Sequence, residues 1–283
     1  MRARDLIREA RSKGILPKKG LGQHFLTSEG VVKKILEGAE VGPEDVVLEI
    51  GPGLGTLTFP LAERAKRVIA VEVDKGLCEF LREKAKGLPL EVVEADFLNW
   101  DLSALRGYGK VKVVSNLPFF LSTEILFRLL ENQGLFSDLT LMFQWEVARR
   151  ITAQPGSKDY GALTVMVRLY SEPKLLFKVP KGAFFPPPEV DAGVVRFSLR
   201  EPPKGGIETL RRTVEGLFSL RRKTLSNALR KMSPLSKEEI QGMLEELGID
   251  PMKRPEAVGP EEFLKIARAL EEKGCSPCRG RGA

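Results

Sequence analysis

The chain has 283 residues, of which 42% are hydrophobic and 29% are charged, and its formal net charge at pH 7 is +7. This length and composition allow one or two globular domains and exclude a disordered tail, a collagen or a coiled coil. No apolar run approaches the roughly 20 residues that a membrane span needs. Residues 1–14 are basic and lack the apolar core of a secretory signal, so we expect a cytoplasmic protein with no membrane partner.

The first two thirds of the chain alternate between apolar, strand-like segments and helical patterns. The expected strands are residues 46–50, 68–73, 90–96, 111–120, 138–143, 162–170 and 191–199. Buried strands that alternate with helices are typical of a parallel, doubly wound α/β sheet. The last two segments show the alternation of antiparallel pairing at a sheet edge, so we expect them to extend that sheet.

Composition shifts at residues 200–206, which are rich in Pro, Gly and charge and indicate a linker. Beyond the linker the patterns are helical. Ser236 and Glu239 have the spacing of a capping box that opens a helix, and Pro260 lies in the first turn of the last helix. We therefore predict an α/β domain over residues 1–199 and a small all-helical domain over residues 200–283.

Positive charge is concentrated in two segments. Residues 1–20 form a basic arm with a net charge of +5, and residues 211–231 carry a net charge of +6, so the rest of the chain is negative. Such clusters are typical of a surface that binds a polyanion. On charge alone, two solvated helix faces explain them equally well.

The few cysteine and histidine residues exclude several chemistries. Cys275 and Cys278 form a C-x-x-C near the end of the chain, but a structural zinc needs four ligands, so we expect a reduced tail and no metal. A Ser-His-Asp hydrolase would depend on His24, the single histidine, and the chain has no G-x-S-x-G.

A glycine-rich turn follows the expected strand 46–50. Gly51, Gly53 and Gly55 alternate with other residues immediately before a helical stretch, which is where nucleotide-type ligands bind in such sheets. A dinucleotide site would have glycine or alanine where Thr56 stands, which disfavours an NAD-dependent oxidoreductase. Glu49 precedes the turn, and the resulting E-x-G-x-G-x-G pattern suits a ligand with an amino-acid moiety, namely S-adenosylmethionine.

Acidic residues end the next two expected strands. Glu72 can accept hydrogen bonds from both ribose hydroxyls of the cofactor, and Asp96 can accept one from the amine of its adenine. Each residue alone is weak evidence, because a solvated carboxylate is common at a strand end. Together with the glycine turn after the first strand, they place groups suited to the cofactor at the ends of three consecutive strands, which favours a cofactor site.

The sequence Asn116-Leu117-Pro118-Phe119 ends the fourth expected strand and indicates a pocket for a planar exocyclic amine. The adenine N6 lone pair is delocalised into the ring, which makes the nitrogen a poor nucleophile. The Asn116 side-chain oxygen and the Leu117 carbonyl can accept the two N6–H bonds, and Phe119 can stack on the base. Methyl transfer then needs positioning rather than a strong base.

Over its whole length, the chain resembles the small-subunit ribosomal RNA adenine-N6,N6-dimethyltransferase (KsgA) family. The matching segments are KKGLGQHFL (18–26), LEIGPGLGTLT (48–58), VEVD (71–74), EADFL (94–98), SNLPFFLST (115–123), MFQWEVARRITAQPGSKDYGALTV (142–165), VPKGAFFPPPEVDAGVVRF (179–197) and LFSLRRKTLSNAL (217–229). The resemblance implies a Rossmann-like class I S-adenosylmethionine-dependent methyltransferase domain, followed by a small helical RNA-binding domain. It also implies dimethylation of two adjacent adenosines near the 3′ end of small-subunit rRNA, within an immature small ribosomal subunit.

The resemblance also implies roles for single residues. The family's cofactor contacts correspond to His24, Leu26, Gly51, Glu72, Asp96 and Asn116, and Gly53 joins them as part of the glycine turn. Phe184 matches an aromatic residue near the flipped base.

Three positions depart from the usual pattern. His24 stands where the family often has Asn, Phe119 replaces the usual Tyr, and Phe120 replaces the following Asn. Because His also forms hydrogen bonds and Phe keeps the stacking face, we expect cofactor binding and base stacking to survive.

The basic segments then have a physical role, because a base must be unstacked from structured RNA before its N6 can be methylated. We expect Arg221, Arg222 and Lys223 to contact RNA phosphates, and the basic arm to close over cofactor and RNA. We also expect a monomer, because no large apolar surface helix stands out.

Other functions remain open on the sequence alone. The first is a large-subunit rRNA adenine methyltransferase of the antibiotic-resistance type, which segment 217–229 disfavours. The second is a non-catalytic assembly factor, which the intact cofactor motifs disfavour. A DNA adenine methyltransferase would need a target-recognition region that is not evident.

Overall fold

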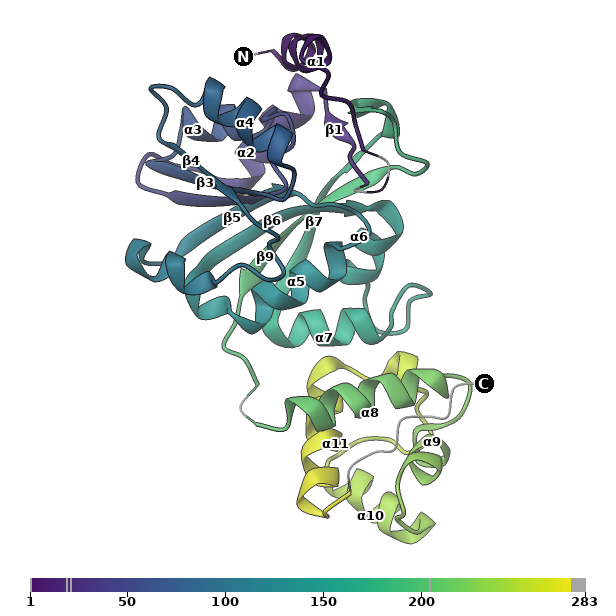
Figure 1. Cartoon of the computed structure of the whole chain (residues 1–283). Coiled ribbons are helices and arrows are strands. Elements are labelled where there is room, and N and C mark those ends of the chain that lie inside the picture. The colour runs from purple at the N-terminus through teal and green to yellow at the C-terminus, as the bar shows by residue number, and fades with distance from the viewer. Residues whose placement is uncertain (1, 19, 21, 204, 276–283) are drawn as a thin grey trace. The chain divides into compact units, whose positions relative to one another are not determined.

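The computed structural model describes residues 2–18, 20, 22–203 and 205–275. A seven-stranded sheet is built from β2 (Val46–Ile50), β3 (Arg67–Glu72), β4 (Leu90–Glu94), β5 (Val111–Asn116), β6 (Phe136–Gln144), β7 (Ser171–Val179) and β9 (Ala192–Leu199). Their order is β4-β3-β2-β5-β6-β9-β7 (Figure 1). The first five in that order pair in parallel, and β9 pairs antiparallel with β6. The predicted α/β class with a mostly parallel sheet is therefore confirmed.

One expected strand is wrong, because residues 162–170 form a helix, α7 (Ala162–Tyr170), and the strand follows it as β7. Six of the nine residues of this helix are buried, and they include Val165, Val167 and Tyr170, which are residue types that are also common in strands. A short apolar run of this kind does not distinguish a strand from a buried helix. The missed signal is at its start, where Thr164 Oγ1 accepts a hydrogen bond from Gly161 N at 3.2 Å.

Helices cover both faces of the sheet. They are α2 (Glu29–Ala39), α3 (Thr58–Ala62), α4 (Lys75–Lys84), α5 (Ser122–Glu131) and α6 (Trp145–Thr152). Helices α3 and α4 pack on β3, while α2 contacts β6 and β9. In Figure 1 these three helices lie on one side of the sheet and α5 on the other. Helix α2 presents Val32, Ile35, Leu36 and Ala39 to the core, which is the spacing of one helix face.

The N-terminal helix α1 (Ala3–Ser12) belongs to the same unit as the sheet. Its Leu6 and Ala10 are buried in a cluster with Phe80 and Leu81 of α4. The two short strands β1 (Phe25–Leu26) and β8 (Phe184–Phe185) then pair antiparallel, with Leu26 opposite Phe184. The helix of the basic arm is thus held by apolar contacts, and the strand that follows the arm is held by backbone pairing.

The chain divides into two compact units, residues 1–149 with 173–199 and residues 150–172 with 200–283, as far as these are described. The second contains α7, α8 (Ile207–Ser219), α9 (Leu225–Met232), α10 (Lys237–Glu246) and α11 (Pro260–Glu272). It differs from the sequence-based division in its inclusion of residues 150–172, because α7 packs against α8 and α11. The capping box at Ser236 and Glu239 forms, with hydrogen bonds in both directions.

Short 3-10 helices complete the secondary structure: η2 (Leu102–Tyr108), η3 (Gln133–Leu135), η4 (Lys181–Ala183) and η5 (Pro255–Ala257). None of the helices in the described ranges combines the length and hydrophobicity that a bilayer crossing requires. Within the same ranges, His, Cys, Asp and Glu side chains form no group of three that would hold a metal ion. Cys275 is buried, and Cys278 of the C-x-x-C lies outside the described residues.

Candidate active site

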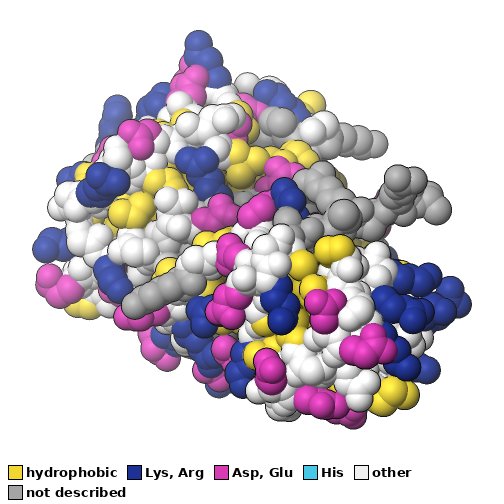
Figure 2. Space-filling model, turned by 90° about the horizontal axis from the view of Figure 1, so that it is seen from below, with side chains coloured by type: hydrophobic (Ala, Val, Ile, Leu, Met, Phe, Trp, Pro, Cys, Tyr) yellow, Lys and Arg dark blue, Asp and Glu magenta, His cyan; other side chains and the backbone are white. Residues whose placement is uncertain are grey.

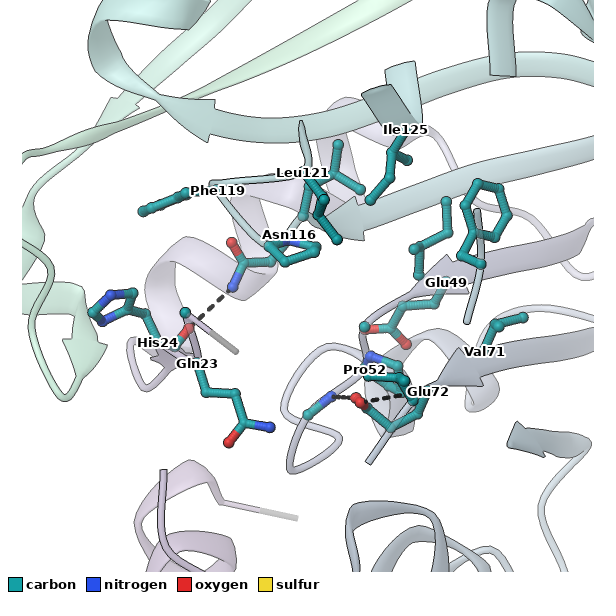
Figure 3. Close-up of a pocket in the computed structure, with 18 of the residues that line it drawn as sticks. Gln23, His24, Glu49, Pro52, Val71, Glu72, Asn116, Phe119, Leu121 and Ile125 are labelled. Carbon is teal, nitrogen blue, oxygen red and sulfur yellow. Dashed lines mark hydrogen bonds between the residues drawn. The ribbon is translucent and has the colours of Figure 1, made fainter. Parts of the chain in front are cut away.

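A cavity of about 420 Å³ opens at the carboxyl ends of the parallel strands. His24, Asn116 and Phe119 lie together at one end, and Glu49 and Glu72 lie at the other (Figure 3). The predicted site residues that line it are His24, Leu26, Gly51, Gly53, Glu72, Asp96, Asn116, Leu117, Pro118 and Phe119. The structure thus brings both predicted halves, for cofactor and for base, into one space.

The glycine turn needs glycine for its backbone and for its packing. Gly51, Gly53 and Gly55 all have positive φ, at +67°, +58° and +82°. A Cβ at Gly53 would lie 2.8 Å from Cδ1 of Phe25, so β1 lies directly against the turn. Glycine is therefore needed at this position partly for packing against Phe25. From the sequence, glycine was expected here only because it lets a ligand approach the backbone.

Glu72 is 5% exposed and holds the turn in place from the end of β3. Its Oε2 accepts from Gly53 N at 3.1 Å, and its Oε1 accepts from the backbone N–H groups of Val73 and Asp74, each at 3.0 Å. Burial raises the pKa of this carboxyl, and the three backbone hydrogen bonds oppose the shift. Oε2 retains a lone pair for a ligand hydroxyl.

Glu49 is the most deeply buried acid of the cavity. It is 2% exposed, and its Oε2 has no hydrogen-bond partner among the described residues. Burial raises its pKa to about 8, and the neighbouring Glu72 carboxylate acts in the same direction. An unpaired carboxyl oxygen at the wall of a cavity is an acceptor, or a counter-charge, for a cationic ligand group.

Asp96 follows β4 and organises its own loop. Its Oδ1 accepts from Leu98 N at 3.0 Å, and its Oδ2 accepts from Asn99 Nδ2 at 2.6 Å. The side chain is exposed and lines the cavity. Because each carboxylate oxygen has two lone pairs, Asp96 remains able to accept from an exocyclic amine.

Asn116 is the best-defined polar group at the other end of the cavity. Its Nδ2 donates to the backbone carbonyl of His24 at 3.2 Å, and its Oδ1 is buried without a hydrogen-bond partner among the described residues (Figure 3). The donor is thus used by the protein and the acceptor is left for a ligand. A buried polar atom without a partner is costly, and such atoms cluster at binding sites.

Aromatic side chains surround this acceptor. The ring centroids of Phe119 and His24 lie 6.0 Å apart with an interplanar angle of 28°, and Phe184 contacts Phe119 edge-on at 6.3 Å. His24 Nδ1 lies 2.8 Å from the carbonyl oxygen of Pro186, which fixes the imidazole. Pairing of β1 with β8 places Phe184 beside Phe119. Phe184 does not itself line the cavity.

Lys18 and Gln23 make contacts with Asp74 that were not expected from the sequence. Lys18 Nζ lies 2.7 Å from Oδ2 of Asp74, and Gln23 Nε2 donates to the same oxygen at 3.4 Å. Asp74 also caps α4, because its Oδ1 accepts from Gly76 N and Leu77 N. The G-Q-H-F-L segment was the available signal, but only His24 and Leu26 of it were selected.

The predicted RNA contacts lie in the second unit and do not line the cavity. Arg221, Arg222 and Lys223 occupy the turn between α8 and α9, and all three are exposed. Arg221 forms an ion pair with Glu256 at 3.6 Å. Figure 2 shows that Lys and Arg side chains gather in groups on one face of the molecule, with Asp and Glu side chains between them.

Known proteins are similar to this chain over most of its length. The family model described as ribosomal RNA adenine dimethylase matches residues 16–272. The ribosomal RNA small subunit methyltransferase A of Moorella thermoacetica is 43% identical over 92% of this chain and 95% of its own length. The protein of the same name from Pelotomaculum thermopropionicum is 41% identical over 95% of this chain and 97% of its own length.

Two solved structures are also similar. A dimethyladenosine transferase from Plasmodium falciparum has a TM-score of 0.78 and 28% identity, and the match covers 90% of this chain and all of that one. The 23S rRNA methyltransferase ErmE has a TM-score of 0.68 and 31% identity over 87% of this chain and 99% of that one. With a family model over nearly its full length and curated relatives above 40% identity, this chain belongs to the ribosomal RNA adenine dimethylase family.

Proposed function

We propose that this protein is a cytoplasmic, monomeric enzyme that transfers methyl groups from S-adenosylmethionine to N6 of adenosine in small-subunit rRNA. It dimethylates two adjacent adenosines near the 3′ end, within an immature small ribosomal subunit. The observation that carries the proposal is the single cavity that joins the glycine turn and Glu72 to Asn116 and Phe119. Direct transfer requires the methyl group and the accepting nitrogen to meet in one space, in line.

The residues of the cavity fit S-adenosylmethionine. Its volume is within the range of small-molecule sites, and the unpartnered Glu49 oxygen suits a ligand that carries positive charge. Glu72 and Asp96 hold acceptors for the ribose and the adenine amine. When bound, the cofactor would supply an activated methyl group on its sulfonium sulfur, and the sulfur would leave as the neutral thioether of S-adenosylhomocysteine.

Asn116 positions the base that is methylated. Because its Nδ2 is held by the His24 carbonyl, its Oδ1 is presented to the cavity as an acceptor for one N6–H bond. The Leu117 carbonyl accepts the second. These bonds reduce delocalisation of the N6 lone pair into the ring and direct it toward the methyl group. The proton is lost to water after transfer.

Phe119 and Phe184 hold the plane of the flipped adenine. Phe119 is pinned between His24 and Phe184, so its ring offers a fixed surface for stacking. Base–aromatic stacking contributes about 1–3 kcal/mol per base, which is comparable with the few kcal/mol that unstacking costs. The missing hydroxyl at residue 119 does not affect this contribution.

Binding of the rest of the RNA is electrostatic. The exposed Arg221, Arg222 and Lys223 contact phosphates from the helical unit, and the basic arm contacts the RNA strand beside the cavity. These contacts locate the protein on the subunit without reading its bases.

The test uses small subunits from cells that lack this modification, incubated with the protein and labelled S-adenosylmethionine. The RNA is then digested and its nucleosides identified. We expect N6,N6-dimethyladenosine from the 3′ end of small-subunit rRNA, abolished by Asn116→Ala. Asn132→Ala is the matched control, because Asn132 lies outside the cavity and its amide donates only to the Arg128 carbonyl.

Two outcomes would contradict the proposal. Label that appears only in large-subunit rRNA would assign the protein to the antibiotic-resistance type. Cofactor binding without any methylation would indicate a non-catalytic assembly factor and would direct attention to Phe119.

A further inference from the structure

Phe120 is an aromatic side chain at the mouth of the cavity that the proposed chemistry does not use. It is 59% exposed and lines the cavity, whereas its neighbour Phe119 is partly buried between two rings. No other ring among the described residues stacks on Phe120. Single exposed apolar side chains are common on protein surfaces, but this one lines the cavity of the proposed site, where a bound substrate can cover it.

A tight turn fixes the direction of Phe120. Leu121 N donates to the carbonyl oxygen of Pro118 at 3.0 Å, so Phe119 and Phe120 are the two central residues of a turn. Phe119 and Phe120 are therefore neighbours in one turn, the first packed against His24 and Phe184 and the second largely exposed.

The ring of Phe120 is supported on one side by Gly22, in the segment that follows the basic arm. A Cβ at Gly22 would lie 3.0 Å from Cδ1 of Phe120, so this ring lies against the backbone of Gly22, whose φ is +57°. The support leaves most of the side chain exposed. It therefore presents a pre-positioned apolar surface whose ordering adds little entropic cost to binding.

The proposed substrate needs such a surface, because a flipped adenosine leaves its neighbour without a stacking partner. We propose that Phe120 is a substrate-positioning residue that stacks on the nucleobase next to the target adenine. This inference rests on the proposed function. Phe119 and Phe120 would then hold two adjacent bases, one inside the cavity and one at its mouth, which matches a substrate of two adjacent adenosines.

The test compares three variants in the small-subunit methylation assay. Phe120→Ala removes the ring, Phe120→Leu keeps an apolar side chain without a π-face, and Phe120→Trp restores stacking. For both Phe120→Ala and Phe120→Leu we expect kcat/KM for the subunit to fall about 10-fold or more, mainly through KM. We expect Phe120→Trp to retain wild-type kcat/KM within about 2-fold. The affinity for S-adenosylmethionine, measured by calorimetry, should be unchanged in all three.

Val190→Ala is the matched control, because Val190 is a 44% exposed apolar side chain of the same unit that lies outside the basic arm and does not line the cavity. It should behave as wild type. Wild-type kinetics in Phe120→Leu would overturn the inference alone, since an aliphatic side chain would then suffice. Parallel loss of cofactor affinity in Phe120→Ala would also overturn it, because Phe120 would then act by holding the arm. An inactive wild-type protein would refute the proposed function and this inference together.

Discussion

Gly55, the third glycine of the turn, is required both by its backbone conformation and by its close packing. Substitution at this position should therefore lower the stability of the fold through both effects. Gly55 has a φ of +82°, and a Cβ there would lie 2.5 Å from Cε2 of Phe59 and 2.8 Å from Cδ2 of Leu81. A left-handed backbone costs a residue with a Cβ about 1–2 kcal/mol, and an added methyl group in a packed core costs about 1–3 kcal/mol. We therefore expect Gly55→Ala to lower the free energy of unfolding by about 2–5 kcal/mol.

Gly87→Ala separates the two contributions. Gly87 has a φ of +81° in the same unit, but nothing lies within 4 Å of its Cβ position, so only the conformational cost of about 1–2 kcal/mol applies. Urea unfolding followed by tryptophan fluorescence measures both, because Trp100 and Trp145, the two tryptophans of the chain, lie in this unit. Equal losses in the two variants would refute the packing argument.

Three further predictions concern charged residues. Glu49→Gln removes a carboxyl whose pKa is raised by burial from 4.5 to about 8. Between pH 4.5 and 8 only the folded state keeps this proton, so the free energy of unfolding of the wild type falls as pH rises through this range. Urea unfolding at several pH values should show that the variant lacks this part of the pH dependence. Asp74→Asn keeps a good helix cap but loses the ion pair with Lys18, so calorimetry should give a several-fold weaker affinity for S-adenosylmethionine, and an unchanged affinity would contradict a role for the arm. Charge reversal at Arg221 and Arg222 should weaken subunit binding and flatten its dependence on salt concentration, and a wild-type salt slope would exclude both from the interface.

One rule of the fold explains why several of the selected residues lie together. In a parallel sheet, the carboxyl ends of neighbouring strands lie at one edge, so residues after β2, β3 and β5 meet whatever their separation in the chain. Glu72 and Asp96 were selected as strand-end residues and Asn116 for its N-L-P-F sequence, and all three line the same cavity as the glycine turn. The fold class followed from the same alternation of buried strands and helices.

The sequence could not predict contacts that depend on irregular, long-range pairing. Strand β1 pairs with β8, which lies about 160 residues further along the chain. A strand of two residues is too short to show a hydrophobic periodicity in the sequence. This pairing brings Phe184 to Phe119. Only the family resemblance placed Phe184 near the base, because the residue alone reads as core packing. No sequence pattern predicts the contact of Gln23 with Asp74 either.

The arm links the two ends of the cavity through backbone as well as side-chain contacts. Lys18 and Gln23 bind Asp74, whose own N–H donates to Glu72 at the cofactor end. The next residue, His24, uses its carbonyl oxygen to orient Asn116 at the base end. Because this last contact is made by the backbone, it is available to His and Asn alike, which explains why the departure at residue 24 leaves the acceptor of Asn116 in place. An arm that loosens would therefore disturb both ends of the cavity together.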